Sequence, residues 1–151
     1  MQTPIVALIY DFDKTLSPRD MEEYSFMPGI GVEPSDFWGL CADFAREHQM
    51  DGILTYMYLM QKMAKGRMEL NREAMEKLGE AVEFFPGVLT WFDRINAVGR
   101  AIGVEVEHYI ISSGLTEIIR GSAIGVTKIG QLPNPQENIH NEKANIKSIQ
   151  P

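Results

Sequence analysis

Two aspartates near the start of the chain are the strongest candidates for chemistry. Asp11 and Asp13 directly follow the apolar run Ile5–Tyr10. Residues two apart on extended backbone point the same way, so we expect both carboxylates to face one small volume. Neighbouring carboxylates repel unless a proton or a cation offsets them, and oxygen ligands suit Mg²⁺. One carboxylate can then attack a phosphorus atom while the other exchanges protons with the leaving and attacking oxygens.

Two serines form a second candidate group. Ser112 and Ser113 follow the apolar end of the stretch 104–111 and precede Gly114. A hydroxyl at a strand tip, surrounded by backbone N–H groups, can bind a phosphoryl oxygen. Ser113 is also a candidate N-cap for a helix over 115–123, and one turn can serve both purposes.

These motifs support a resemblance to a known family. The run from Asp11 to Leu16, Asp-Phe-Asp-Lys-Thr-Leu, resembles the first motif of haloacid dehalogenase superfamily phosphatases. The resemblance implies that Asp11 is the nucleophile that becomes an aspartyl phosphate. It implies that Asp13 is the general acid and base, that Asp11 and Asp13 hold Mg²⁺, and that Asp13 uses its backbone carbonyl. The apolar strand ending at Ser112 is similar to the family's second motif, in which this serine, or Ser113 beside it, binds phosphate.

The resemblance weakens toward the C-terminus. The family's third motif contains a lysine, and Lys143, on a helix expected to begin near residue 141, lies at a plausible distance. Most lysines are solvated, and Lys143 is open to that interpretation too. The sequence contains no strand followed by the Gly-Asp-x-x-Asp run that supplies further metal ligands in the family. We therefore expect a core that is incomplete at its C-terminus, a weakened Mg²⁺ site, and self-association through an uncovered sheet edge.

The expected fold is α/β. The resemblance implies a Rossmann-like parallel sheet core formed by residues 1–18 and 84–151, with an inserted α-helical cap over residues 19–83. The apolar run 5–10 predicts a buried strand, and the stretches 104–111 and 126–132 predict two more. In the family such a cap closes over the active site and determines which substrate enters.

Helical spacing predicts most of the cap. We expect helices over residues 19–27, 35–44, 51–66 and 71–83, and a further helix from 86 to 98. Ser35 and Asp51 are candidate N-caps, Pro28-Gly29 is expected to end the first helix, and Gly99 the last. Six methionines between residues 50 and 75 predict either ordinary helical packing or an adaptable binding surface.

Other polar side chains give weaker signals. Arg19 is expected to be a solvated charge, with a phosphate contact as the alternative. His48 has no second ligand at metal-binding spacing. His108 lies early on its strand, so no catalytic role is expected for it.

Composition limits the classes of function. The 151-residue chain is 44% hydrophobic and carries a formal net charge of −7, which argues against nonspecific nucleic-acid binding. The single Cys41 excludes an internal disulfide and suits a reducing cytoplasm. The sequence shows no secretory leader, and no apolar run approaches the length of a membrane span, so no membrane partner is expected.

Three functional hypotheses follow. The first is a Mg²⁺-dependent phosphatase that acts on a small phosphorylated metabolite. The second is a catalytically incomplete domain of the same type that only binds a ligand or partner. The third is a dehalogenase or a phosphonate-cleaving relative. The second aspartate, Asp13, argues against the dehalogenase, and the phosphonate chemistry needs a buried cap lysine, for which Lys62 and Lys65 are the candidates.

Overall fold

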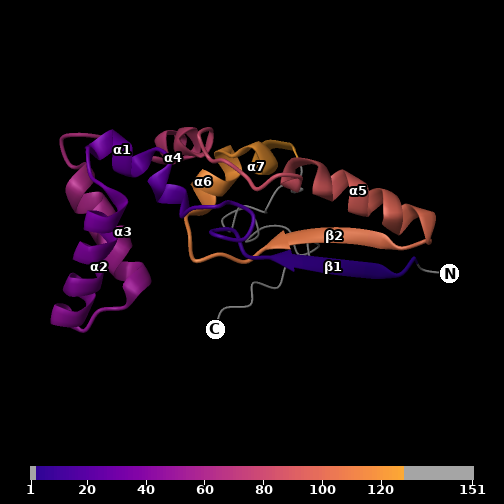
Figure 1. The fold of residues 1–151 in the computed structure, drawn as a ribbon, viewed down its shortest axis with the longest axis horizontal. Helices are drawn as coiled ribbons and strands as arrows, with labels where there is room; N and C mark the ends of the chain where they lie inside the picture. The colour runs from indigo at the N-terminus through magenta and orange to yellow at the C-terminus, as the bar shows by residue number, and fades with distance from the viewer. Residues whose placement is uncertain (1–2, 128–151) are drawn as a thin grey trace, which may run out of the picture.

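The structure is a computed structural model that describes residues 3–127. Figure 1 shows three groups of elements: α1–α3 at one end, the two strands with α5 at the other, and α4, α6 and α7 between them. The elements in chain order are β1 (Ile5–Tyr10), a 3₁₀ turn (Met21–Glu23), α1 (Phe26–Ile30), α2 (Pro34–His48), α3 (Gly52–Ala64), α4 (Arg72–Gly79), α5 (Val88–Ala101), β2 (Glu105–Ile110), α6 (Thr116–Gly121) and α7 (Ala123–Thr127).

The sheet is small. β1 and β2 pair in parallel, with Ile5 opposite Glu105 and Tyr10 opposite Ile110, and they are the sheet's two strands within the described residues. The prediction of a Rossmann-like sheet core is therefore wrong for this part of the chain, where most apolar segments form helices. The strand expected over 126–132 is wrong at its start, since Val126 and Thr127 end α7, and its remainder lies outside the described residues.

Within the described residues, helix α5 covers one face of the strand pair (Figure 1). Gly99 of α5 lies so close to β2 that a Cβ there would be 2.6 Å from the Val106 side chain. Val106, Tyr10 and His108 belong to this covered face. Ile5 and Ile9 lie on the other face and are 55% and 59% exposed, so the prediction of a buried first strand is wrong.

The hydrophobic core near the strands lies beyond their tips. Phe12 and Leu16 of the loop after β1 pack with Phe92 of α5 and with Ile118 and Ile119 of α6. Phe12 and Ile118 are fully buried. The loop that carries both aspartates is therefore anchored by one apolar side chain between them, Phe12, and by another after them, Leu16.

Helices α1, α2 and α3 form a second core, and we call these three helices the helical lobe. Phe26, Phe37, Leu59 and Met60 are buried within it, and the rings of Phe26 and Phe37 meet edge to face. Leu115, which precedes α6, packs against both cores. The lobe and the strand-side core therefore meet at the segment that carries the two serines.

The sequence predicts where the helices lie more accurately than it predicts the residues at which they begin and end. Asp51 caps α3 as expected, because its carboxylate accepts from the N–H groups of Ile53 and Leu54. Helix α2 instead begins at Pro34, with Glu33 rather than Ser35 at the cap position. Pro28 lies inside α1, where the first turn of a helix needs no N–H donor. Gly99 lies inside α5 because its missing side chain allows β2 to approach.

The helices are short. The longest between residues 3 and 127 is α2, with 15 residues, and none there has the length and apolarity to cross a bilayer.

Candidate functional site

The loop after β1 holds the Asp11 carboxylate in place. One carboxylate oxygen accepts the N–H of Phe12 at 2.8 Å, and the other accepts the Thr15 hydroxyl at 3.3 Å. The N–H groups of Leu16 and Ser17 both donate to the Phe12 carbonyl, at 2.9 and 3.1 Å, which closes the loop tightly. Asp11 is exposed at the strand tip, so its carboxylate is both oriented and accessible.

Asp13 is half-buried, and its carboxylate accepts the N–H of Met21 at 2.8 Å. Burial raises the pKa of Asp13 to about 6, since it disfavours the charged form, and the negative charges of Asp20 and Asp11 raise it further. The Met21 hydrogen bond and the nearby Lys14 oppose this rise. A carboxyl with this pKa can both give and accept a proton near neutral pH.

The serine turn, residues 112–114, follows β2. The Ser112 hydroxyl oxygen accepts the N–H of Gly114 at 3.0 Å, which leaves the hydroxyl proton available for donation. Ser113 is exposed, and its carbonyl accepts the hydroxyl of Tyr56 from α3 at 2.8 Å. Ser113 does not cap α6: the cap residue is Leu115, without a side-chain cap bond, so that prediction is wrong.

Asp13 and the serine turn lie together. A Cβ at Gly114 would lie 2.1 Å from the Met21 methyl group and 3.2 Å from a carboxylate oxygen of Asp13. The strand register explains why they meet. Tyr10 and Ile110 are opposite each other at the ends of two parallel strands, so the segments that follow both strands leave the sheet at its carboxyl end. Asp13 and the serine turn therefore lie at the same end of the strand pair.

A cavity of about 300 Å³ opens between this edge and the helical lobe, and we call it the acidic cavity. Asp13, Ser113 and Gly114 line one side, whereas Asp11 and Ser112 are not among its lining residues. The remaining lining residues come from the 3₁₀ turn, α2 and the start of α3: Asp20, Glu22, Trp38, Asp51, Gly52, Ile53 and Tyr56.

Sequence reasoning missed Glu22, Trp38 and Tyr56. Glu22 is only 2% exposed, and burial raises its pKa to about 7, with Asp13, Asp20 and Glu23 adding to the rise. Burial also raises the pKa of Tyr56, and the Glu22 carboxyl contributes. The sequence held one signal for this region, the acidic residues between Asp20 and Glu23. These residues could equally be explained by the favourable interaction of negative charges with the N-terminus of a helix.

The described residues offer few side-chain ligands for Mg²⁺. Within residues 3–127, no three or more His, Cys, Asp or Glu side chains gather as a metal's ligands would. Mg²⁺ is often held by one or two carboxylates together with waters and substrate phosphates. Asp11 and Asp13 are the carboxylates that could take part in such a site, and of the two only Asp13 lines the acidic cavity.

The other polar candidates lie elsewhere. Lys143 falls outside the described residues. Arg19 stacks on Tyr24, with 4.2 Å from the guanidinium carbon to the ring centroid, and it does not line the acidic cavity. His48 stacks on Phe44 at the end of α2. His108 is hydrogen-bonded between Tyr10 and Asn96 under α5.

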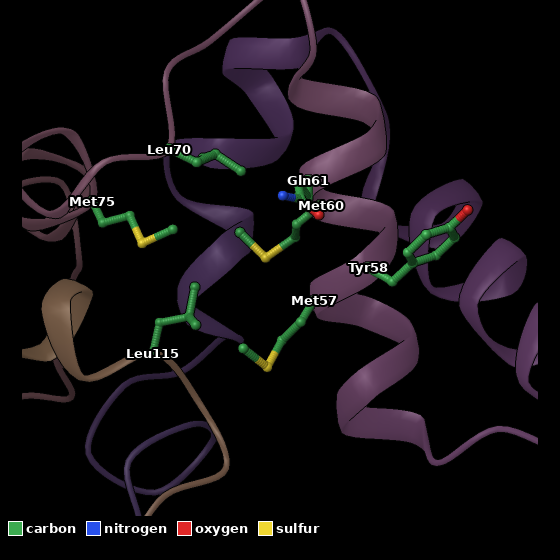
Figure 2. A pocket seen from close by; sticks show the side chains of 7 residues that line it. All are labelled: Met57, Tyr58, Met60, Gln61, Leu70, Met75 and Leu115. Atoms are coloured by element: carbon green, nitrogen blue, oxygen red, sulfur yellow. The ribbon is translucent and has the colours of Figure 1, made fainter.

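A second cavity, of about 370 Å³, lies between α3 and the segments around Leu70, Met75 and Leu115. Figure 2 shows the side chains of Met57, Met60 and Met75 pointing into this space. Met60 is also part of the helical lobe's core, so this side chain contributes both to packing and to the cavity wall. Lys62 and Lys65 are exposed and line a different cavity, so neither is a buried amine suited to Schiff-base chemistry.

Comparisons with known proteins add little about function. No family model matches the chain, and no solved structure matches it with significance. The chain is 28% identical over 131 residues to an uncharacterized protein from Borreliella burgdorferi. The match covers 80% of this chain and 46% of that protein, so the chain spans about half the length of the curated relative it matches.

Proposed function

We propose that this chain belongs to a Mg²⁺-dependent phosphomonoester hydrolase of the haloacid dehalogenase type, with Asp11 as the nucleophile. The observation that carries the proposal is the state of Asp13. Its carboxyl lies beside the serine turn, lines a cavity and has a pKa of about 6. A general acid and base works best when its pKa is close to the operating pH.

The first half of the reaction transfers the phosphoryl group to the protein. A carboxylate oxygen of Asp11 forms a bond to phosphorus, and the bond from phosphorus to the ester oxygen breaks. Protonated Asp13 gives its proton to the departing oxygen, so the alcohol leaves neutral and Asp13 becomes a carboxylate. The bonds from Phe12 and Thr15 orient Asp11 before the attack.

The second half regenerates the protein. The Asp13 carboxylate takes a proton from a water whose oxygen bonds to phosphorus, and the bond from phosphorus to Asp11 breaks. Inorganic phosphate leaves and both aspartates return to their starting states. The Ser112 hydroxyl donates a hydrogen bond to a phosphoryl oxygen throughout, while the N–H of Gly114 holds the serine in place. When bound, Mg²⁺ offsets the negative charge of the carboxylates and the phosphoryl group.

A small phosphorylated metabolite is the substrate that this reaction would take, because the acidic cavity, which Asp13 lines and Asp11 and Ser112 do not, has a volume of only about 300 Å³. A cytoplasmic location fits this substrate class and the single cysteine. Cys41 is buried and burial raises the pKa of its thiol to about 11, so it does not compete as a nucleophile.

Hydrolysis of p-nitrophenyl phosphate by the full 151-residue chain tests the proposal. Activity should require Mg²⁺ and disappear with excess EDTA. Asp11→Asn should abolish turnover, and Asp13→Asn should reduce kcat by about 10²- to 10⁴-fold, since it removes proton transfer. Asp36→Asn, at an exposed position in the first turn of α2, is the matched control and should leave the rate unchanged. Full activity in Asp11→Asn would overturn the mechanism.

A second candidate function is binding without catalysis, and the sparse donor set within residues 3–127 favours it. In that case the chain would bind inorganic phosphate with no Mg²⁺-dependent turnover. Calorimetric titration with phosphate, run beside the hydrolysis assay, separates the two candidates.

A further inference from the structure

Helix α5 is joined to the strand pair by a series of side-chain hydrogen bonds. The Trp91 indole N–H donates to the Tyr10 hydroxyl oxygen at 2.9 Å. That hydroxyl lies 2.9 Å from Nδ1 of His108, and Nε2 of His108 lies 3.0 Å from Oδ1 of Asn96. Trp91 and Asn96 belong to α5, Tyr10 to β1 and His108 to β2. These four side chains, which we call the polar chain, therefore connect three elements.

The acceptor at one end of the polar chain determines where its protons lie. The Asn96 oxygen can only accept, so the proton of neutral His108 is on Nε2. Nδ1 is then an acceptor, and the Tyr10 hydroxyl donates to it. The Tyr10 oxygen in turn accepts the Trp91 N–H. Every hydrogen bond therefore runs in the same direction, from Trp91 to Asn96, as long as His108 is neutral.

Protonation of His108 is incompatible with this arrangement. The imidazolium carries an N–H group at both ring nitrogens, so Nδ1 can no longer accept from Tyr10. The Tyr10 oxygen would then face two donors, Trp91 and His108, and its own proton would have to point away from the polar chain. The hydrogen bond between Tyr10 and His108 must rearrange, which weakens the contact between α5 and the two strands.

The rings around His108 also favour its neutral form. The Tyr10 ring lies nearly parallel to the imidazole, with 5.9 Å between the centroids, and the Phe92 ring of α5 meets it edge to face at 5.1 Å. Tyr10 is the titratable group that meets His108 from β1, whereas Phe92 and Asn96 of α5 do not ionise. Burial lowers the pKa of His108 below its usual value of 6.5, since it disfavours the charged ring.

The charged groups near His108 do not oppose this effect. Glu107 and Tyr109 flank it on β2, so their side chains point to the opposite face, where they are hydrogen-bonded to each other at 2.6 Å. The charged residues of α5 are Asp93, Arg94 and Arg100. All three are exposed, and none contributes to the lowering of the His108 pKa. Burial is therefore the cause of the shift.

We propose that the polar chain is a pH-sensitive lock, which holds α5 against the strand pair while His108 is neutral and opens when His108 binds a proton. Tyr10 is the last residue of β1 and directly precedes Asp11. Opening therefore frees the side chain at the base of the loop that carries both aspartates. The lock is a property of the fold and does not rest on the proposed function.

Nuclear magnetic resonance of the full chain over a range of pH tests the lock. The proton on Cε1 of His108 should titrate with a pKa below 6.5. The Trp91 indole N–H signal should shift with the same midpoint, because its acceptor is the Tyr10 hydroxyl. Hydrogen exchange of the α5 amides, corrected for its intrinsic pH dependence, should show protection falling about tenfold between about pH 7.5 and pH 5.5, the factor that corresponds to one pKa unit. The amides of α2 provide the internal reference.

Three variants complete the test. His108→Gln keeps an acceptor and a donor but cannot titrate, so the protection of α5 should no longer depend on pH in this range. Tyr10→Phe removes the hydroxyl that donates to Nδ1, so the pKa of His108 should rise toward 6.5. His48→Gln, at an exposed position on α2, is the matched control and should behave as the wild type.

Four results would overturn the inference. They are a His108 pKa of 6.5 or above in the wild type, constant protection of α5, an equal fall in protection in His108→Gln, and an unchanged His108 pKa in Tyr10→Phe. The pKa of His108 in the wild type is measured without any substitution, so the inference can fail even if a variant does not fold.

Discussion

The helical lobe and the strand pair differ in how they bury apolar surface. In the lobe, Phe26 and Phe37 are fully enclosed by neighbours from α1, α2 and α3. In the strand pair, Ile5 and Ile9 are more than half exposed, although they belong to the most apolar run in the N-terminal region. The apolar character of the first strand therefore did not ensure its burial, because helix α5 covers only one face of the strand pair within the described residues.

The difference shows where the candidate site obtains its rigidity. The loop that carries Asp11 and Asp13 does not depend on a deeply buried strand. It depends on Phe12, which is buried at the base of the loop, and on Met21, whose N–H holds Asp13. The site lies at the boundary between the two regions and takes support from both.

Truncation of a lobe residue should give the largest effect. Phe37→Ala removes a ring that packs against Phe26 and Trp38, and we expect a loss of about 3–5 kcal/mol in the free energy of unfolding. Ile9→Ala on the exposed strand face should cost less than about 1 kcal/mol. Urea denaturation followed by circular dichroism measures both. Equal losses would show that the comparison between the two regions is wrong.

A substitution of Glu22, which lies where the two regions meet, should have an intermediate effect on the free energy of unfolding. Glu22 has a raised pKa in the folded protein, so the folded state binds its proton more tightly than the unfolded chain does. Its cost to stability is absent below about pH 4.5, grows as the pH rises, and is complete above about pH 7. Glu22→Gln should therefore stabilise the protein by about 2–3 kcal/mol at pH 8 and change little at pH 4.

Denaturation at the two pH values measures this difference, and Glu47→Gln provides a surface control. A stabilisation of equal size at both pH values would mean that ionisation of Glu22 is not its cause.

The smallest effect should appear in self-association of the strand pair. Ile5 and Ile9 form an exposed apolar face beside an unpaired strand edge within the described residues. Replacing both by lysine should weaken any association about tenfold, because two like charges then meet across the contact. Sedimentation velocity over a range of concentrations measures this change. Ile102→Lys, at the exposed end of α5, should have no such effect.

The sequence predicted elements whose signals are local. Helix α3 was found with its cap because Asp51 and the apolar spacing after it lie within one segment. The prediction that Gly99 ends a helix is wrong, because this glycine instead allows close packing of α5 against β2. That contact is between two separate elements and has no local sequence signal. The predicted sheet has too many strands for a related reason. An apolar run indicates that a strand forms, but it does not indicate how many other strands pair with it.

The same distinction between local and long-range signals applies to the residues of the candidate site. The nearness of Asp13 to the serine turn followed from two strands that end at one edge. The contributions of Glu22, Trp38 and Tyr56 could not be predicted, because they depend on how the helical lobe packs against that edge. Asp11 was predicted by its motif, and its hydrogen bonds to Phe12 and Thr15 are local ones.

Gly114 limits how this site can be redesigned. Its backbone lies so close to the Met21 thioether and the Asp13 carboxylate that even alanine would force one of them to move. The adjacent Ser113 side chain is exposed and has room to vary. A mutant library built to change ligand preference should therefore randomise position 113 and keep glycine at position 114.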